Sequence, residues 1–594
     1  MRSRSRSGWA RFLLITKPFF RSRAGWRALG LLAVLLMLVL VVKGLDIRNS
    51  YVYGDLITSA TERKAEQVCR LALLYAGVFA VSAVVAAFLR FTEEMLGLRW
   101  RDWLTRHLTD RYLANRAYHR IRTTGQLDNP DQRISEDVKT FTTNTLSIFL
   151  ILVNATVALA GFAGVLWGIT PWLLLGAVGY AAFGTIMTVL LGKRLVGLDV
   201  QQFKKEADFR YELIRVREHA DPIALLRGED REKGRVSRRL QKALQNFRTI
   251  IGVNRNLGFF TSWYGYMTQL IPVLITVPLY IRGEIEFGQV MQAQVAFNFV
   301  LDAFSLIVKE FQRITTFAAV VERLSAFYAA TEDISADAKP SLEIVENDAH
   351  VAYEGLTLAT PDDGRLLLAD LTLEVPAGKR LLIVGPDGSG RTALMRATAG
   401  LWKSGQGRIV RPPLERILFL PQQPYLTLGS LRDQLLYALP EWATVSDSRL
   451  LAVLQDVQLE SVLERVGGLD SEQREWTSLL TLGEQQSLSF ARLLLAHPEF
   501  AFLDEATSAL PAHRVQALYD LLARTSTTYI SVSSNRDLLD YHDTLLHLRG
   551  DGTWNATDIA CEPAEAGWNS GGQRSSPATE GSSLARFSSR VAVS

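Results

Sequence analysis

The chain has few cysteines and little excess charge of either sign. Cysteine occurs only at Cys69 and Cys561 among 594 residues, and this separation matches no metal-ligand spacing. We therefore expect no disulfide framework, which suits a chain whose bulk faces a reducing compartment. The net charge of +4 does not indicate a nucleic-acid partner, and none is expected.

No acidic residue precedes Asp46, whereas Lys and Arg are frequent there. A cleaved targeting signal has a short apolar core, but a longer apolar run follows here at 28–42. We expect residues 1–25 to form a basic amphipathic segment, with 8–20 lying on the membrane surface. A disordered basic tail is the alternative.

Long apolar runs predict membrane spans, because a bilayer-spanning helix needs roughly 20 mostly apolar residues. The fifth run carries Pro272 and Pro278 and the sixth several polar groups, so these two signals are weaker. Residues 26–330 therefore predict an all-α transmembrane domain with six helices. The predicted spans are 26–46, 70–91, 146–168, 172–192, 259–281 and 287–308.

Charge predicts the topology of these spans. Residues 193–257 are rich in Lys and Arg, as is the N-terminus, whereas the short connectors are poor in positive charge. The positive-inside bias then places the N-terminus and the long connectors, 92–145 and 193–258, in the cytoplasm. Helical periodicity predicts that both connectors continue as helices beyond the bilayer.

The C-terminal half has a different composition. Residues 331–345 predict a polar linker, and alternating strand and helix signals at 346–560 predict an α/β domain. Residues 561–594 are Ser/Gly/Ala-rich with few apolar positions, which predicts a disordered tail.

The stretch LLIVGPDGSGRTALM reads as a strand, a Gly-rich turn and the start of a helix. It fits G-x-x-x-x-G-K-[ST] except that Arg391 replaces lysine. Backbone N–H groups of such a loop and the helix N-terminus hold phosphate oxygens, and Thr392 supplies a hydroxyl to Mg²⁺. Taken alone, a chance Gly-rich turn is the alternative. The predicted nucleotide-binding residues of the loop are Gly385, Pro386, Asp387, Gly388, Ser389, Gly390, Arg391, Thr392 and Ala393.

Three further segments extend this prediction. An apolar strand ends in Asp504 and Glu505, where Asp504 would hold Mg²⁺ and Glu505 would polarise the attacking water. FLPQQPYL places Gln422 within reach of the metal and the water. LLTLGEQQSLSFARLLLAHP opens a helix that is a second anion site. The nucleotide-binding residues predicted there are Thr481, Gly483 and Glu484.

The order of phosphate loop, glutamine loop, helix-opening signature and acidic pair resembles an ATP-binding cassette (ABC) domain. The form LGEQQ and the stretches LDNPDQRISEDVKTFT and EADFRYELIRVREHADPIALLRGEDRE resemble SbmA/BacA-like bacterial transporters and peroxisomal fatty-acyl half-transporters. The resemblance covers about residues 8–550. It implies an exporter-type six-helix transmembrane domain followed by an α/β P-loop NTPase domain that uses ATP and Mg²⁺.

The resemblance also implies a dimer. A homodimer is expected first, and a heterodimer stays open. Thr481, Gly483 and Glu484 would then serve the ATP of the partner, and coupling helices would lie within 128–137 and 218–229.

Several residues depart from the family pattern. Arginine at 391 keeps the charge, but its guanidinium is wider and more rigid than an ammonium. The alignment puts Ser534 at the catalytic switch position, usually His, while His542 is expected to have a bland surface role. Pro511 and Ser487 also differ from the usual residues, and no stacking aromatic lies near Thr360. These changes predict ATP binding with weak turnover.

The sixth span contains Gln294, Asn298 and Asp302, whose spacing stacks them on one helical face. An intramembrane carboxylate needs water or a partner. We expect this stripe to line the translocation path, with hydrogen bonding between helices as the alternative.

These observations predict a multi-pass half-transporter in a bacterial inner membrane, with its N-terminus and ATP-binding domain cytoplasmic. The resemblance implies bulky amphiphilic cargo such as peptides, cobalamin-like or acyl compounds. The alternative is a hydrolysis-poor nucleotide-binding partner or regulator, or a proton-driven conduit with a degenerate ATPase module.

Overall fold

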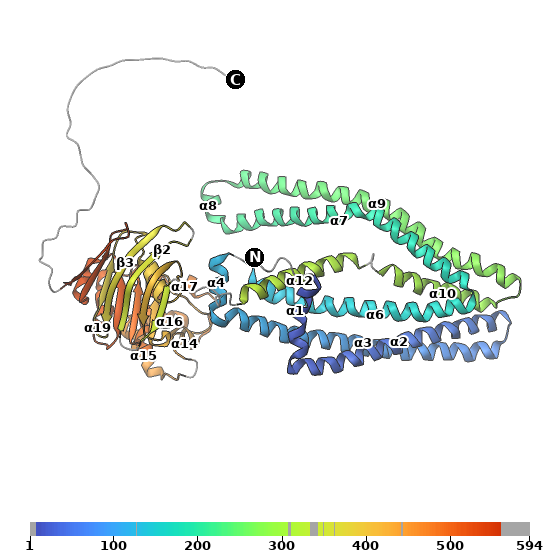
Figure 1. Ribbon diagram of the computed structural model, residues 1–594, viewed down its shortest axis with the longest axis horizontal. Coiled ribbons are helices and arrows are strands. Elements are labelled where there is room, and N and C mark those ends of the chain that lie inside the picture. Colours follow the sequence, from blue (N-terminus) through green and yellow to red (C-terminus); the bar gives the residue numbers. More distant parts are fainter. Residues whose placement is uncertain are drawn as a thin grey trace, which may run out of the picture. The chain divides into compact units, whose positions relative to one another are not determined.

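The computed structural model describes residues 8–125, 127–306, 310–332, 342–347, 350–361, 363–440, 443–473 and 475–559. The chain divides into two units, Met1–Ile334 and Ser335–Ser594 (Figure 1). The predicted tail at 561–594, most of the predicted linker and the end of the sixth predicted span lie outside the described residues.

The first unit is helical, and its long helices continue past the apolar runs into charged sequence. Thus α3 (Ala65–Leu113) extends well beyond the second predicted span, as expected if the connector 92–145 begins as a continuation of that helix. Thr170 separates α6 from α7, which begins with Pro171, a residue suited to the first helical turn. The helices are α1 (Gly8–Arg21), α2 (Arg23–Thr61), α3 (Ala65–Leu113), α4 (Ala117–Thr124), α5 (Pro130–Gln132), α6 (Val138–Ile169), α7 (Pro171–Glu218), α8 (Ala220–Leu225), α9 (Glu229–Ile281), α10 (Phe287–Phe304) and α12 (Phe311–Thr331), with short turns at Ala114–Arg116 and Arg133–Asp137.

Five helical segments among the described residues are long and apolar enough to cross a bilayer. They are Arg23–Thr61, Ala65–Thr124, Pro130–Ile169, Pro171–Glu218 and Glu229–Ile281. They contain the first five predicted spans. The sixth predicted span falls on α10, whose polar residues lower its mean hydropathy. That α10 crosses the bilayer therefore stays a prediction.

Small residues and stacked rings hold these helices together. A Cβ at Gly288 would overlap the Gly54 carbonyl oxygen, so α10 crosses α2 at backbone contact. The rings of Tyr180 and Tyr264 stack with centroids 4.3 Å apart, and each hydroxyl donates to the other residue's carbonyl. This double contact joins α7 to α9, which run alongside each other in Figure 1.

Helix α1 covers a cluster of aromatic side chains. Ile15 and Phe19 are fully buried, and Phe19 stacks on Trp100 of α3 with centroids 5.4 Å apart. Beside this cluster, Asp137 accepts two hydrogen bonds from Arg323 of α12, at 2.7 and 2.6 Å. The predicted amphipathic segment is thus a helix whose apolar face packs on protein, and its place on the membrane surface stays a prediction.

The second unit has two sheets with helices packed on them. One sheet has the order β1-β5-β2-β3, and the larger has the order β10-β9-β4-β8-β7-β6. The strands are β1 (Leu342–Glu346), β2 (His350–Ala359), β3 (Leu366–Pro376), β4 (Leu381–Val384), β5 (Gly405–Arg411), β6 (Ile417–Leu420), β7 (Phe500–Asp504), β8 (Thr528–Val532), β9 (Thr544–Leu548) and β10 (Trp554–Asp558). The helices are α13 (Arg391–Thr398), α14 (Leu431–Leu436), α15 (Asp447–Asp456), α16 (Glu460–Val466), α17 (Trp476–Leu479), α18 (Leu482–Ala496) and α19 (Ala512–Ala523), with short turns at Leu414–Arg416 and Arg536–Tyr541.

Neighbouring strands β4, β8, β7 and β6 are parallel. The carboxyl ends of parallel strands meet at one edge of a sheet, where ligands of α/β folds bind. The four loops that leave this edge carry the phosphate loop, Ser534, the acidic pair and Gln422. The topology therefore gathers these predicted residues at one place.

Candidate nucleotide site

The phosphate loop connects β4 to α13 and depends on its glycines. Gly388 and Gly390 have φ angles of 76° and 98°, a region that side chains rarely adopt. A Cβ at Gly385 would lie 2.5 Å from the Leu548 carbonyl oxygen. The backbone is therefore wound into the shape that presents N–H groups to an anion.

Arg391, at the lysine position, is nearly buried and lies between two carboxylates. Its Nη2 donates to Asp387 Oδ1 at 2.9 Å, and its Nη1 lies 3.2 Å from Glu505 Oε1 as an ion pair. Nη1 makes no hydrogen bond with the described residues. The predicted phosphate-binding cation thus pairs with the predicted general base.

Asp504 and Thr392 meet at the end of β7. Thr392 Oγ1 donates to Asp504 Oδ1 over 3.4 Å, and burial raises the pKa of the Asp504 carboxyl. The buried Ser389 Oγ has no hydrogen-bond partner among the described residues. A desolvated carboxylate, two hydroxyls and a glycine cradle fit a magnesium-bound triphosphate, which supplies the missing cation and acceptors.

Gln422 contacts Glu505 directly. Its Nε2 donates to Glu505 Oε2 at 3.0 Å, and Glu505 itself has a φ of 46°. The contacts of Glu505 with Gln422 and Arg391 hold its carboxylate in one orientation. The predicted general base and the predicted water-orienting amide are therefore brought together.

Gln486 contacts the loops of the candidate site and was not among the residues predicted from the sequence. It is fully buried, and its Nε2 donates to the Gln422 carbonyl at 3.1 Å and to Ser508 Oγ at 3.1 Å. Its Oε1 accepts from Ala509 N–H at 2.9 Å. One amide thus ties α18 to the loops after β6 and β7. No signal in the sequence singles it out, because Gln485, Ser487 and Ser489 of the same helix are also polar and buried.

The predicted signature residues form the start of α18. The Thr481 side chain caps the helix and exchanges hydrogen bonds with Glu484, which also accepts from Arg465 at 2.9 Å. A Cβ at Gly483 would lie 3.0 Å from the Ala509 carbonyl oxygen. Among the described residues, Thr481 and Glu484 bond to this local group and not to the phosphate loop. That these residues bind the ATP of a partner subunit stays a prediction.

Ser534 follows β8, the strand between β4 and β7, and is exposed. Its neighbour Ser533 is buried and donates its N–H to the Ile383 carbonyl at 3.2 Å. Position 534 therefore lies at the sheet edge that carries the other predicted site residues. Its serine side chain is shorter than the imidazole of histidine. The switch assignment stays a prediction.

His542 is buried, in contrast to the expected surface role. Its Nδ1 and Nε2 contact Leu538 O at 2.6 Å and Ser531 Oγ at 2.9 Å, between the rings of Tyr519 and Tyr529. Burial lowers the pKa of His542 to about 4. This side chain supports the core behind β8, and it does not replace Ser534.

This burial predicts a loss of stability in acid. Neutral His542 stabilises the fold fully above about pH 6.5, and protonation removes that contribution as pH falls toward 4, by about 2 kcal/mol at pH 5. The melting temperature should drop less between about pH 7.5 and 5 in His542→Gln than in the wild type. His513→Gln, at an exposed position on α19, should keep the wild-type pH dependence. Equal drops in all three proteins would contradict the assignment.

The predicted path residues share one face of α10. Asn298 and Asp302 are exposed and Gln294 is half-buried, whereas Gln292, Ala296 and Val300 are buried on the other side. The helical spacing is thus borne out, and the role of this face in translocation stays a prediction.

Two family models match the chain. The ABC transporter transmembrane region 2 model matches residues 15–281, and the ABC transporter model matches residues 368–508. The first match lies within the helical unit and the second within the α/β unit.

Similar proteins cover nearly the whole chain. An ABC transporter ATP-binding protein of Synechocystis is 40% identical over 90% of this chain and 82% of its own length. The chloroplastic ABC transporter D family member 2 of Arabidopsis thaliana is 37% identical over 91% and 86%. The human lysosomal cobalamin transporter ABCD4 is 30% identical over 93% and 96%.

A solved structure shows the same fold. A bacterial Atm1-family ABC exporter with ATP bound aligns with a TM-score of 0.71 at 17% identity, covering 89% of this chain and 96% of its own. The predicted order of a helical exporter-type domain and an α/β nucleotide-binding domain is thereby confirmed. The chain is an integral membrane protein of the ABC transporter family, a half-transporter that fuses one transmembrane unit to one ATP-binding unit.

Proposed function

We propose that two copies of the chain form an ATP-driven transporter for bulky amphiphilic solutes in a bacterial inner membrane. Each copy carries both a phosphate loop and a signature helix, so a homodimer supplies two complete sites, and a heterodimer is the other arrangement. The basic connectors support a cytoplasmic position for the N-terminus and the ATP-binding unit.

The observation that carries the proposal is the gathering of Arg391, Thr392, Asp504, Glu505 and Gln422 at one sheet edge. The loop and its helix N-terminus bind the phosphates, and Thr392, Gln422 and Asp504 would hold Mg²⁺. When bound, Mg²⁺ neutralises charge on the phosphate oxygens.

The residues around Glu505 divide the remaining work. A Glu505 oxygen accepts a proton from the attacking water, while Gln422 fixes the carboxylate by its hydrogen bond. Gln486 donates a hydrogen bond to the Gln422 carbonyl and so holds that backbone in place. The chain therefore has the groups that phosphoryl transfer to water requires, apart from the usual lysine and switch histidine.

One observation favours the alternative of a hydrolysis-poor partner subunit. Arg391 lies 3.2 Å from Glu505, so the side chain at the lysine position pairs with the proposed general base, and this ion pair has to break before Arg391 can contact phosphate. We therefore expect slow turnover, and a regulatory or proton-driven role remains the second candidate.

The proposed cargo class rests on relatives and on the open face of α10. One relative is named a lysosomal cobalamin transporter, and Gln294, Asn298 and Asp302 give this helix a polar stripe within an apolar domain. A polar stripe beside apolar walls suits a solute with both characters.

Phosphate release by the protein in lipid nanodiscs tests this cargo class. Cobalamin, a long-chain acyl-coenzyme A and an amphipathic peptide are added separately, with glucose as the hydrophilic control. We expect at least one amphiphile to raise the rate above its basal value and glucose to have no effect. If no amphiphile stimulates, the cargo proposal fails, while a retained basal rate leaves the ATPase assignment intact.

A further inference from the structure

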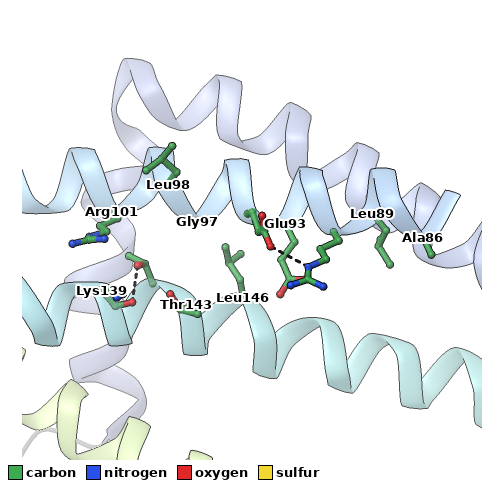
Figure 2. A pocket seen from close by; sticks show the side chains of 12 residues that line it. Ala86, Leu89, Glu93, Gly97, Leu98, Arg101, Lys139, Thr143 and Leu146 are labelled. Atoms are coloured by element: carbon green, nitrogen blue, oxygen red, sulfur yellow. Dashed lines mark hydrogen bonds and ion pairs between the residues drawn. The ribbon is translucent and has the colours of Figure 1, made fainter. Parts of the chain in front are cut away.

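A pocket in the helical unit lies between α3 and α6 (Figure 2). Its volume is about 580 Å³, within the range of roughly 300–1,000 Å³ typical of ligand sites. Charged side chains form one part of its wall and small or aliphatic side chains the other. No residue of the nucleotide site or of the proposed path on α10 belongs to this pocket.

Two cations of the wall are not neutralised by the described part of the chain. Arg101 of α3 and Lys139 of α6 are exposed, and neither side chain makes a hydrogen bond or an ion pair there. Arg90 differs, because its Nε donates to Glu94 Oε1 at 3.1 Å, one turn along α3. Figure 2 shows Arg101 and Lys139 at the same end of the pocket, one from each helix. Both cations are therefore accessible to a ligand at that end.

Glu93 sets the charge balance of the wall. It is half-buried on α3 and makes no hydrogen bond or ion pair with the described residues. The cations that act on it, Arg90 and Arg313, each pair with another carboxylate at 3.1 Å. Those pairs are neutral, so Arg101 and Lys139 outweigh Glu93 by one positive charge. A ligand with one negative charge and a hydroxyl donor balances this wall.

The other end of the pocket is aliphatic. Ala86 and Leu89 of α3 line this end, and Figure 2 shows them apart from Arg101 and Lys139. Both belong to the predicted span 70–91, whereas the two cations belong to the connector predicted to lie in the cytoplasm. With the bilayer where the proposed function puts it, the pocket reaches from the acyl chains to the headgroups of the cytoplasmic leaflet.

We propose that this pocket binds a glycerophospholipid with one net negative charge and a hydroxylated headgroup, the chemistry of phosphatidylglycerol. The phosphate accepts hydrogen bonds from Arg101 and Lys139, and a headgroup hydroxyl donates to Glu93. One acyl chain lies along Ala86 and Leu89. Basic pockets between membrane helices on the cytoplasmic side suit such headgroups. The inference rests on the bilayer position in the proposed function, but not on ATP hydrolysis or cargo.

Two other occupants fit the wall less well. The ammonium of phosphatidylethanolamine can pair with Glu93, but this lipid has no net charge, so the excess positive charge stays unbalanced. A soluble phosphate can bind both cations, but it leaves the aliphatic end in contact with water. The combination of an excess cation and an aliphatic end therefore favours an anionic lipid.

Photo-crosslinking in nanodiscs tests the proposal, with a phosphatidylglycerol that carries a diazirine on its acyl chain and without added cargo. Crosslinks should map to residues 86–101 and 139–146. Arg101→Gln and Lys139→Gln should each lower the yield about fivefold, the effect of one cation beside an anionic lipid. Arg99→Gln, at an exposed position of α3 outside the pocket, changes the net charge equally and should keep the yield. Equal yields in all four proteins would overturn the proposal.

Filling the aliphatic end is an independent test. Ala86→Trp occupies the space of the acyl chain and should lower the yield about fivefold or more. Ala87→Trp, at the next exposed position but outside the pocket, should keep the wild-type yield. Equal crosslinking in these two variants would mean that the lipid lies elsewhere on the helices. Melting temperatures confirm that the variants are folded.

Competition separates the possible occupants. Unlabelled phosphatidylglycerol should displace the labelled lipid about fivefold better than phosphatidylethanolamine does. Glycerol 3-phosphate and an acyl-coenzyme A, added in solution, should not displace it. Equal competition by the two lipids would reveal an unselective lipid contact, and displacement by either soluble anion would reveal a phosphate or cargo site. Each of these results would contradict the proposal, and none of the measurements needs ATP turnover.

Discussion

Glu505→Gln is expected to lower phosphate release by the protein in lipid nanodiscs about 10²- to 10⁴-fold, the range of a general base. Glutamine has nearly the same shape and can still contact Gln422, whose Nε2 lies 3.0 Å from Glu505 Oε2. It cannot accept a proton from water. The variant should still bind ATP, because the phosphate loop and Asp504 are unchanged.

The control for this experiment is Glu499→Gln. Glu499 lies at the opposite end of the same strand and pairs with Arg416 on the surface. Loss of an exposed ion pair should change turnover little. If Glu505→Gln keeps the wild-type rate, another group activates the water and the assignment of Glu505 is wrong. If the wild type itself shows no activity, the hydrolysis-poor alternative gains support.

The sequence predicted those site residues whose positions follow from the order of strands and loops along the chain. The phosphate loop, Asp504, Glu505 and Gln422 were predicted together because each follows a buried strand, and parallel strands place such loops at one edge. The positions of glycines with positive φ, such as Gly390, follow from the same motif. Five of the predicted spans fall on helices that are long and apolar enough to cross a bilayer, because both judgements rest on hydropathy and length, and their position in a membrane stays a prediction.

The partners of individual side chains were beyond sequence reasoning. Arg391 was expected to face phosphate, and its ion pair with Glu505 depends on the direction of two long side chains, one at the start of α13 and one just after β7. His542 was expected on the surface, but the fold buries it against Ser531. The apolar face of residues 8–20 reads the same whether it meets lipid or protein, so its packing on Trp100 was not predictable.

The double variant Arg391→Lys, Ser534→His is expected to raise phosphate release at least about tenfold over the wild type, because two well-placed groups at a developing charge each contribute strongly. Lysine is too compact to bridge Asp387 and Glu505 as Arg391 does at 2.9 and 3.2 Å. It therefore leaves the general base free and places a point charge at the phosphates. Position 534 follows β8, the strand beside β7, and an imidazole there extends farther toward the acidic pair than a serine hydroxyl.

The single variants show how the gain divides. Arg391→Lys alone should give most of the gain, because it changes the phosphate contact and also removes the ion pair with Glu505. Ser534→His alone should raise the rate only if ATP is already correctly placed. Arg396→Lys, the same substitution at an exposed position on α13, should leave turnover unchanged. A gain in the double variant larger than the product of the single gains would show that the two positions act on one reaction. No gain in any variant would mean that these residues do not limit hydrolysis, and the Arg391–Glu505 ion pair would then be a resting arrangement that ATP displaces without loss of rate.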